Sequence, residues 1–179
     1  MAITKMSLKE VGDSFFNEHV EKFIIEQPFL SFVILSSMIE FMGKCYKCRK
    51  DFHESGHSKE DYYDAINNLQ FLQKYIVFNY GDTKDKCNHM YKWLRCGMLH
   101  AFLPKEGIKL ASGNNDLNNK IVGAKELYTD ILNAWDEIKK DSDILNYINN
   151  STAIIVYDNT SGQTASDSSS ISGGTPYNN

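Results

Sequence analysis

The sequence predicts an all-α protein: an up-and-down bundle of four to five helices, with a small β-hairpin before the last long helix. The main support is the spacing of apolar residues, which recur every three or four positions over most of residues 7–140, the period of an amphipathic helix. Residues 108–123 differ, because two short apolar runs flank a turn-rich stretch there, which is typical of a hairpin. The 179 residues, 42% of them hydrophobic, are enough for one domain with a core. We expect this domain over 1–157 and a disordered Ser/Gly-rich tail over 158–179.

The helices expected before the hairpin have recognisable start and stop signals. Ser7 and Glu10 form a capping-box pattern at the start of the first helix, and Pro28 ends it. The second helix is apolar nearly all round, which places it at the centre of the bundle. Ser58 followed by Asp61 caps the third helix. These four helices are expected over 7–26, 29–49, 59–78 and 84–103.

Beyond the hairpin, the pattern predicts one long helix and two shorter elements. The long helix is expected over 124–140, where apolar residues again recur at helical spacing. Residues 144–148 are expected to add a short helical turn. Residues 153–157 are expected to form an edge strand beside the hairpin.

Charge and apolar run length exclude several classes of protein. A net charge of −4 and a pI of about 5.7 count against a non-specific nucleic-acid coat, which needs a basic surface, but they allow a local cationic pocket. No signal region follows Met1, and no apolar run approaches the ~20 residues of a membrane span. We therefore expect a cytoplasmic protein without membrane contact, in which the four cysteines are reduced thiols.

Arg95 and His100 are the candidate functional pair. Arginine is scarce, since only Arg49 and Arg95 occur among the 19 Lys and Arg residues, so an arginine in an apolar helical run indicates a need for a guanidinium. Its planar fork suits phosphate or carboxylate, and a histidine five residues later can transfer a proton near neutral pH. On an ideal α-helix the two side chains lie about 140° apart, with Tyr91 on the flank of Arg95. The pair therefore needs the long arginine stem, Glu40 or a second subunit to form one site.

The segment from Leu94 to His100, Leu-Arg-Cys-Gly-Met-Leu-His, resembles the motif of the HEPN superfamily (higher eukaryotes and prokaryotes nucleotide-binding domain). In that family an Arg and a His, about four to six residues apart, lie on a late helix of an up-and-down bundle. The resemblance covers roughly residues 7–140 and implies a homodimer with the Arg–His pairs in a cleft at its interface. Many members look like metal-independent ribonucleases, and others only bind nucleotides or partners. The resemblance thus implies Arg95 as a phosphate clamp and His100 as the proton-transfer residue, while Cys96 occupies a position that is commonly Asn, Asp or His in the active families.

Glu40 lies in a strongly apolar stretch and allows two interpretations. A buried carboxylate normally needs a partner, and Arg95 suits it because the second and fourth helices should be close in a compact bundle. Alternatively, Glu40 lies on the solvent-facing strip of its helix, with Lys44 nearby in sequence. In the first case Glu40 orients Arg95 and is a supporting site residue, together with Tyr91 and Cys96.

Cys45, Cys48, His53 and His57 have a spacing that bears comparison with a zinc knuckle, since two thiolates and two imidazoles suit tetrahedral zinc. The two cysteines, however, also fit the inner face of the second helix, and the two histidines fit an ordinary polar loop. No metal or other cofactor is therefore predicted, and these four residues are the alternative zinc ligands.

Two functions are open on this evidence. The first is a metal-independent endoribonuclease acting at a dimer-interface cleft, as in the toxin of a bacterial toxin–antitoxin or defence system. The second is a non-catalytic helical dimer that binds a nucleotide, RNA or a cognate protein partner through the same cleft. The intact pair of Arg95 and His100 favours the first, and the acidic pI together with Cys96 favours the second.

Overall fold

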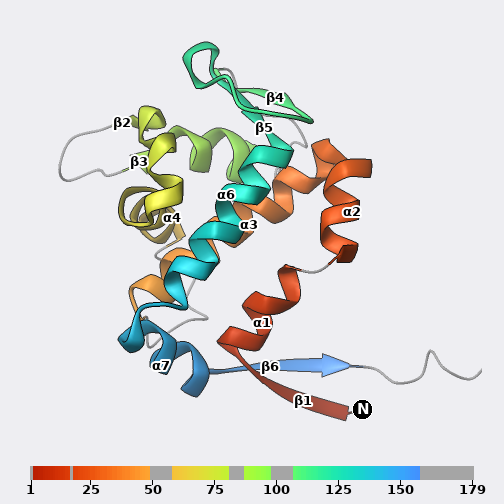
Figure 1. The fold of residues 1–179 in the computed structure, drawn as a ribbon, viewed down its shortest axis with the longest axis vertical. Coiled ribbons are helices and arrows are strands. Elements are labelled where there is room, and N and C mark those ends of the chain that lie inside the picture. The colour runs from red at the N-terminus through yellow and green to blue at the C-terminus, as the bar shows by residue number, and fades with distance from the viewer. Residues whose placement is uncertain (1, 17, 49–57, 81–86, 98–106, 158–179) are drawn as a thin grey trace, which may run out of the picture.

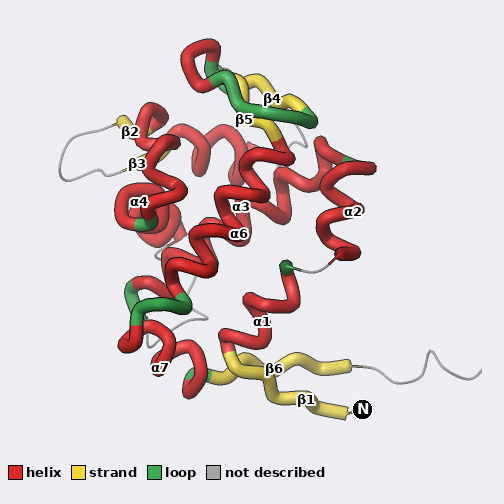
Figure 2. Tube along the Cα trace, viewed as in Figure 1, coloured by secondary structure: helices red, strands yellow, loops and turns green. Residues whose placement is uncertain are grey.

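The computed structural model describes residues 2–16, 18–48, 58–80, 87–97 and 107–157, and these residues are mostly helical (Figure 1). Their strands form three two-stranded sheets at the periphery of the helices (Figure 2). The predicted mainly α-helical character is confirmed, and strands are more numerous than expected.

The predicted first helix is divided in two and preceded by a strand. The elements are β1 (Ala2–Ser7), α1 (Leu8–Phe15) and α2 (Glu18–Glu26). The capping box is confirmed, because Ser7 Oγ accepts from the Glu10 N–H at 3.2 Å and the Ser7 N–H donates to Glu10 Oε2 at 2.7 Å. One helix over 7–26 is wrong, because Phe16 leaves helical geometry and lets α1 and α2 pack separately.

α3 (Pro28–Tyr46) is the central helix, as its apolar sequence predicts. Pro28 starts it, since a first-turn residue needs no N–H partner. The helix packs against α4 (Ser58–Asn68) and α6 (Ala124–Ile138). By length and composition alone α3 could cross a membrane, but more than half of it is buried within the described structure, which favours a core helix.

The predicted third helix changes type after α4. A 3₁₀-helix, η2 (Gln70–Phe78), follows it. Leu72, Tyr75 and Phe78 are buried in η2 at a spacing of three, which is the repeat of a 3₁₀-helix. Runs of 3₁₀-helix longer than about four residues are uncommon. We infer that the burial of Leu72, Tyr75 and Phe78 makes the 3₁₀ conformation of η2 more stable than an α-helical one.

The hairpin predicted over 108–123 is wrong, because its two strands run parallel. β4 (Lys109–Ala111) and β5 (Ile121–Gly123) pair in the same direction. Between them the chain passes through a 3₁₀ turn, η4 (Leu117–Asn119), which ends at Lys120 in the left-handed conformation (φ 57°). This extra turn reverses the chain a second time, which a hairpin does not do.

A polar network holds this loop to η2 and α6. The Tyr75 hydroxyl donates to Asp130 Oδ2 at 2.6 Å, and Lys74 Nζ lies 3.0 Å from both Asp130 Oδ1 and Glu126 Oε1. The backbone N–H of Asn115 donates to Glu126 Oε2 at 2.8 Å, and its side-chain amide donates to the Tyr75 hydroxyl at 2.8 Å. We call these five residues the loop clamp.

The C-terminal helices follow the prediction closely. α6 begins as expected and ends two residues before the predicted boundary at 140, and α7 (Ser142–Asn150) is longer than the turn expected over 144–148. Asp141 caps α7, since its Oδ1 accepts from the N–H groups of Asp143 and Ile144 at 3.0 and 3.1 Å.

The last strand has a different partner from the predicted one. β6 (Thr152–Tyr157) pairs antiparallel with β1, at the opposite end of the protein from β4 and β5 (Figure 1). α7 returns the chain to the N-terminus, where the Leu8 N–H donates to the Ser151 carbonyl at 2.9 Å, and this contact starts the pairing. The predicted tail, 158–179, lies outside the described residues.

Candidate functional site

Arg95 lies on a helical segment over 89–97, called here the motif helix. Asn88 sets its start, because Asn88 Oδ1 accepts the Met90 N–H at 2.7 Å. The Asn88 side-chain amide in turn donates to Asn79 Oδ1 at 2.7 Å and to the Tyr75 carbonyl at 3.1 Å. Arg95 therefore sits on a helix whose beginning is tied to η2.

The turn that carries Arg95 is π-helical rather than α-helical. It spans Tyr91–Arg95 (η3) and is closed by the Cys96 N–H, which donates to the Tyr91 carbonyl five residues earlier. A π turn adds a residue to the helical repeat, so positions computed for an ideal α-helix do not apply across it. Such turns are rare in proteins, and those that occur are often found at functional sites.

Glu40 contacts Arg95, which decides between the two interpretations of this carboxylate. Arg95 Nε donates to Glu40 Oε2 at 3.0 Å, across the interface between α3 and the motif helix. The other oxygen, Oε1, accepts from Ser58 Oγ at 2.6 Å and lies 3.5 Å from Lys44 Nζ. The Glu40 side chain is only 11% exposed, so these partners replace the water that it gives up.

The Tyr91 ring also supports the guanidinium. The Tyr91 ring centroid lies 5.8 Å from Arg95 Cζ, within range of a cation–π contact. Tyr91 in turn meets Tyr62 edge-on at 5.5 Å, and Tyr62 is fully buried. Burial raises the pKa of both hydroxyls, and the neighbouring Cys96 thiol also raises the pKa of Tyr91. Both tyrosines are therefore neutral supports at physiological pH.

An open pocket of about 230 Å³ lies beside the ion pair, lined by Ser37, Glu40, Phe41, Lys44 and Arg95. Glu40 engages Nε of Arg95, and among the described residues neither Nη group has a hydrogen-bond partner. The Arg95 side chain is 26% exposed and lines this pocket. One carboxylate and two cations give this group a net charge of +1. The pocket is thus suited to a small anion such as a phosphodiester oxygen pair.

The other predicted site residues are divided between described and undescribed parts of the chain. His100, His53 and His57 lie outside the described residues. Cys45 is fully buried with a free thiol, and its burial raises its pKa, which disfavours the thiolate that zinc requires. Among the described residues no group of three or more His, Cys, Asp or Glu could hold a metal ion.

Sequence reasoning missed three residues around the ion pair. The sequence pattern places Ser58 at a helix start, and it gives Tyr62 no role at the site. Lys44 was expected to accompany Glu40 only in a solvent-facing strip, yet its side chain is mostly buried beside the carboxylate. The spacing of Glu40 and Lys44 by one helical turn was the available signal.

Comparison of the chain with protein-family models, with curated protein sequences and with solved structures finds no significant match.

Proposed function

We propose that this protein is a HEPN-like protein that acts on RNA as a metal-independent endoribonuclease, with Arg95 as the phosphate clamp and His100 as the general acid or base. The observation that carries the proposal is the guanidinium of Arg95, which Glu40 holds at Nε while the Arg95 side chain lines a pocket that also contains Lys44. Such a fork, fixed but not fully used, is what phosphate recognition requires.

The proposed chemistry is transfer of the phosphodiester to the neighbouring ribose hydroxyl. His100 would accept the 2′-hydroxyl proton or donate a proton to the leaving 5′-oxygen. The 2′-oxygen forms a bond to phosphorus as the bond to the 5′-oxygen breaks, and Arg95 stabilises the charge that develops on the non-bridging oxygens. From the resemblance to HEPN proteins we further propose that the helices form an up-and-down bundle. Two cytoplasmic subunits would then form a dimer in which the Arg95 and His100 pairs line one cleft.

The second candidate is a non-catalytic dimer that binds a nucleotide, RNA or a protein partner through the same pocket. Cys96, in a position that is commonly Asn, Asp or His in active HEPN families, favours this candidate. The net charge of −4 also favours binding at one local pocket over coating of long RNA.

The test is RNA cleavage in excess chelator by the wild-type protein, Arg95→Ala and His100→Ala. Activity in the wild type that both variants lose supports the ribonuclease. Exposed His19, on α2, provides a matched control, because His19→Ala should retain full activity. RNA binding without cleavage, weakened by Arg95→Ala, supports the second candidate. Neither binding nor cleavage by the wild type contradicts both.

A further inference from the structure

The pocket beside Arg95, called here the Arg95 pocket, has one lining residue that phosphate binding does not use. This residue is Phe41, which follows Glu40 on α3 and is half-buried. The face of an aromatic ring carries partial negative charge, so Phe41 does not attract an anion. A ligand that contacts the whole lining therefore needs a flat apolar group as well as an anionic one.

Two aromatic neighbours hold the Phe41 ring in place. Its centroid lies 6.0 Å from that of Phe15 and 5.8 Å from that of Trp135. The interplanar angles are 67° and 51°, so neither neighbour is a parallel stack. Trp135 is completely buried, and its Nε1–H donates to Asp13 Oδ1 at 2.8 Å, which fixes the Trp135 ring. These contacts orient Phe41 at the pocket.

The cations of the Arg95 pocket lie next to this ring. Lys44 follows Phe41 by three residues, so both lie on one side of α3, and Arg95 lines the same pocket from the motif helix. Ser37 donates its hydroxyl proton to the Val33 carbonyl at 2.9 Å, so that proton is already used. An anion in the pocket therefore meets Arg95 and Lys44, and a flat group meets Phe41.

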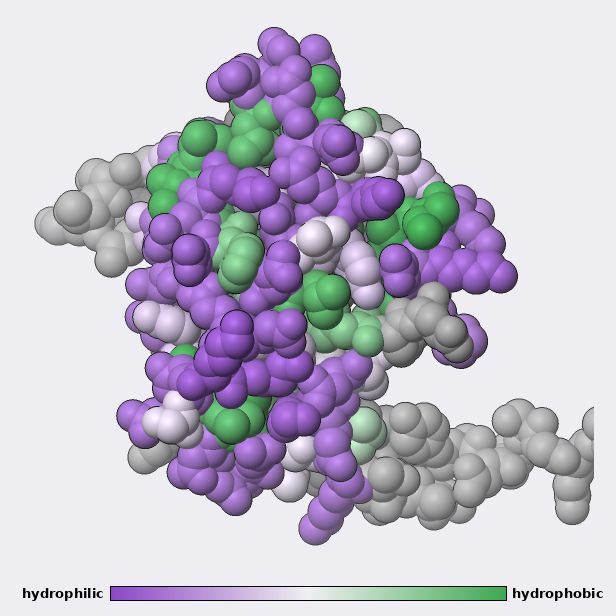
Figure 3. Space-filling model, viewed as in Figure 1, coloured by the Kyte–Doolittle hydropathy of each residue, from purple (hydrophilic) through white to green (hydrophobic). Residues whose placement is uncertain are grey.

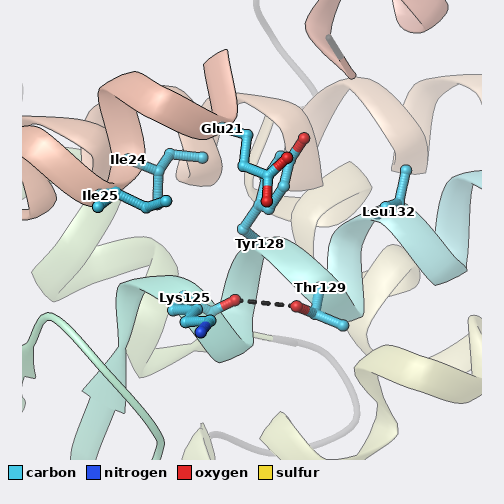
Figure 4. Close-up of a pocket in the computed structure, with 7 residues that line it drawn as sticks. All are labelled: Glu21, Ile24, Ile25, Lys125, Tyr128, Thr129 and Leu132. Atoms are coloured by element: carbon cyan, nitrogen blue, oxygen red, sulfur yellow. Dashed lines mark hydrogen bonds between the residues drawn. The ribbon is translucent and has the colours of Figure 1, made fainter. Parts of the chain in front are cut away.

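A second pocket, of about 140 Å³, lies between α2 and α6 and differs in charge (Figure 4). It also combines an aromatic ring with a lysine, Tyr128 with Lys125, but Glu21 offsets the charge of the lysine. Hydrophobic atoms gather over α2 on this face, which is otherwise mostly hydrophilic (Figure 3). The lining of the α2–α6 pocket is thus neutral, whereas that of the Arg95 pocket has a net charge of +1.

We propose that Phe41 is a specificity-determining residue, which stacks on an unpaired base of RNA while Arg95 and Lys44 bind the adjacent phosphate. This role rests on the proposed function, in which Arg95 is the phosphate clamp, and it adds a contact to the base. A nucleotide carries its planar base and its phosphate on one sugar, so both can reach a single pocket. Bases of a duplex are already stacked and paired. The Arg95 pocket therefore selects single-stranded RNA, whatever the base.

The first test is binding of a single-stranded 2′-O-methyl RNA oligonucleotide to the full chain, measured by fluorescence anisotropy. This ligand lacks the attacking 2′-hydroxyl, so its binding is measured without cleavage. Phe41→Leu should raise the dissociation constant roughly 5- to 150-fold, and Phe41→Tyr, which keeps the ring, should stay within about two-fold of wild type. Tyr128→Leu is the matched control, because it removes a ring from the other pocket and should leave the dissociation constant unchanged. Equal affinity of Phe41→Leu and wild type overturns the proposal.

The second test changes the ligand, so it holds even if Phe41→Leu folds poorly. An abasic oligonucleotide keeps every phosphate but has no bases. The wild type should bind it, and a duplex of the same sequence, more weakly than the complete single strand, and Phe41→Leu should weaken binding of the abasic ligand no further. Equal affinity of the wild type for the single strand and for either other ligand overturns the proposal. So does an equal loss in Phe41→Leu for the complete and abasic ligands, which would show a structural role.

The outcomes separate this role from the proposed ribonuclease activity. Binding that depends on Phe41 and on the bases, without cleavage of natural RNA, supports stacking and contradicts the ribonuclease. Cleavage that Arg95→Ala abolishes, with wild-type affinity in Phe41→Leu, supports the ribonuclease and overturns stacking. A wild-type protein that binds none of the oligonucleotides contradicts both.

Discussion

The Arg95 pocket and the loop clamp each bring acidic and cationic side chains together beside a tyrosine, yet they use them differently. In the loop clamp, Tyr75 donates to Asp130 and accepts from Asn115, and Lys74 bridges two carboxylates. Its hydrogen-bonding groups are directed at one another. In the Arg95 pocket, Glu40 takes one guanidinium donor, and the Nη groups find no partner among the described residues. The comparison separates a structural network from a site with spare donors.

Tyr75→Ala should give the largest effect, and it should act on stability alone. Tyr75 is completely buried, so its truncation leaves a cavity and removes the hydroxyl shared by Asp130 and Asn115. We expect the free energy of unfolding to fall by about 3–5 kcal/mol, measured by urea denaturation. RNA affinity of the folded fraction should stay within two-fold of wild type, on the order expected for a remote change. A loss of RNA binding by the folded Tyr75→Ala protein would contradict this division between the loop clamp and the Arg95 pocket.

Arg95→Ala should show the reverse pattern. The side chain is partly exposed, and Glu40 keeps Ser58 and Lys44 as partners, so the free energy of unfolding should fall by about 1 kcal/mol or less. RNA cleavage should fall about 100-fold or more, as for loss of a transition-state donor. Arg95→Lys should not rescue it, because lysine keeps the charge but cannot donate at Nε and Nη together. Full rescue by lysine would show that charge alone is used.

Glu40→Ala should affect both properties moderately. It leaves the Ser58 hydroxyl and the Arg95 Nε without their acceptor, which we expect to cost about 1–3 kcal/mol in the free energy of unfolding. Glu40→Gln retains an acceptor and should recover part of this loss. Equal stability of wild type and Glu40→Ala in thermal unfolding would show that the ion pair contributes nothing.

The smallest effect concerns pH and the loop clamp. Burial raises the pKa of Asp130 above 3.8, and its hydrogen bonds to Tyr75 and Lys74 only partly offset this. The folded protein then binds the Asp130 proton more tightly than the unfolded chain does. Protonation of Asp130 therefore stabilises the folded protein, fully below pH 3.8, and this stabilisation is lost as pH rises through the folded pKa. Relative to wild type, Asp130→Asn should therefore become more stable as pH rises from about 4 toward neutrality. An unchanged difference across this range would contradict the raised pKa.

The sequence could predict the elements that local chemistry specifies. The capping box at Ser7 and the apolar periodicity of α3 and α6 required no tertiary information. The contact of Glu40 with Arg95 was foreseeable because a carboxylate in an apolar stretch needs a cation, and arginine is scarce in this chain.

What could not be predicted depends on partners that are distant in sequence. The pairing of β1 with β6 joins the two ends of the described chain, and no local pattern in Ala2–Ser7 identifies its partner. The parallel order of β4 and β5 depends on a second reversal at Lys120. The row of Leu72, Tyr75 and Phe78 did carry a signal, since its spacing of three fits a 3₁₀-helix better than an α-helix.

The central claim is that the Nη groups of Arg95 are available to bind phosphate, and its most direct test is ¹H–¹⁵N NMR of the arginine side chains. The chain has only Arg49 and Arg95, so Arg49→Lys leaves a single Nε–Hε signal to follow. We predict that this signal shifts in Glu40→Gln, and that addition of a single-stranded RNA oligonucleotide shifts it and sharpens the Nη signals. RNA binding that leaves every Arg95 signal unchanged would contradict the assignment of Arg95 as the phosphate clamp.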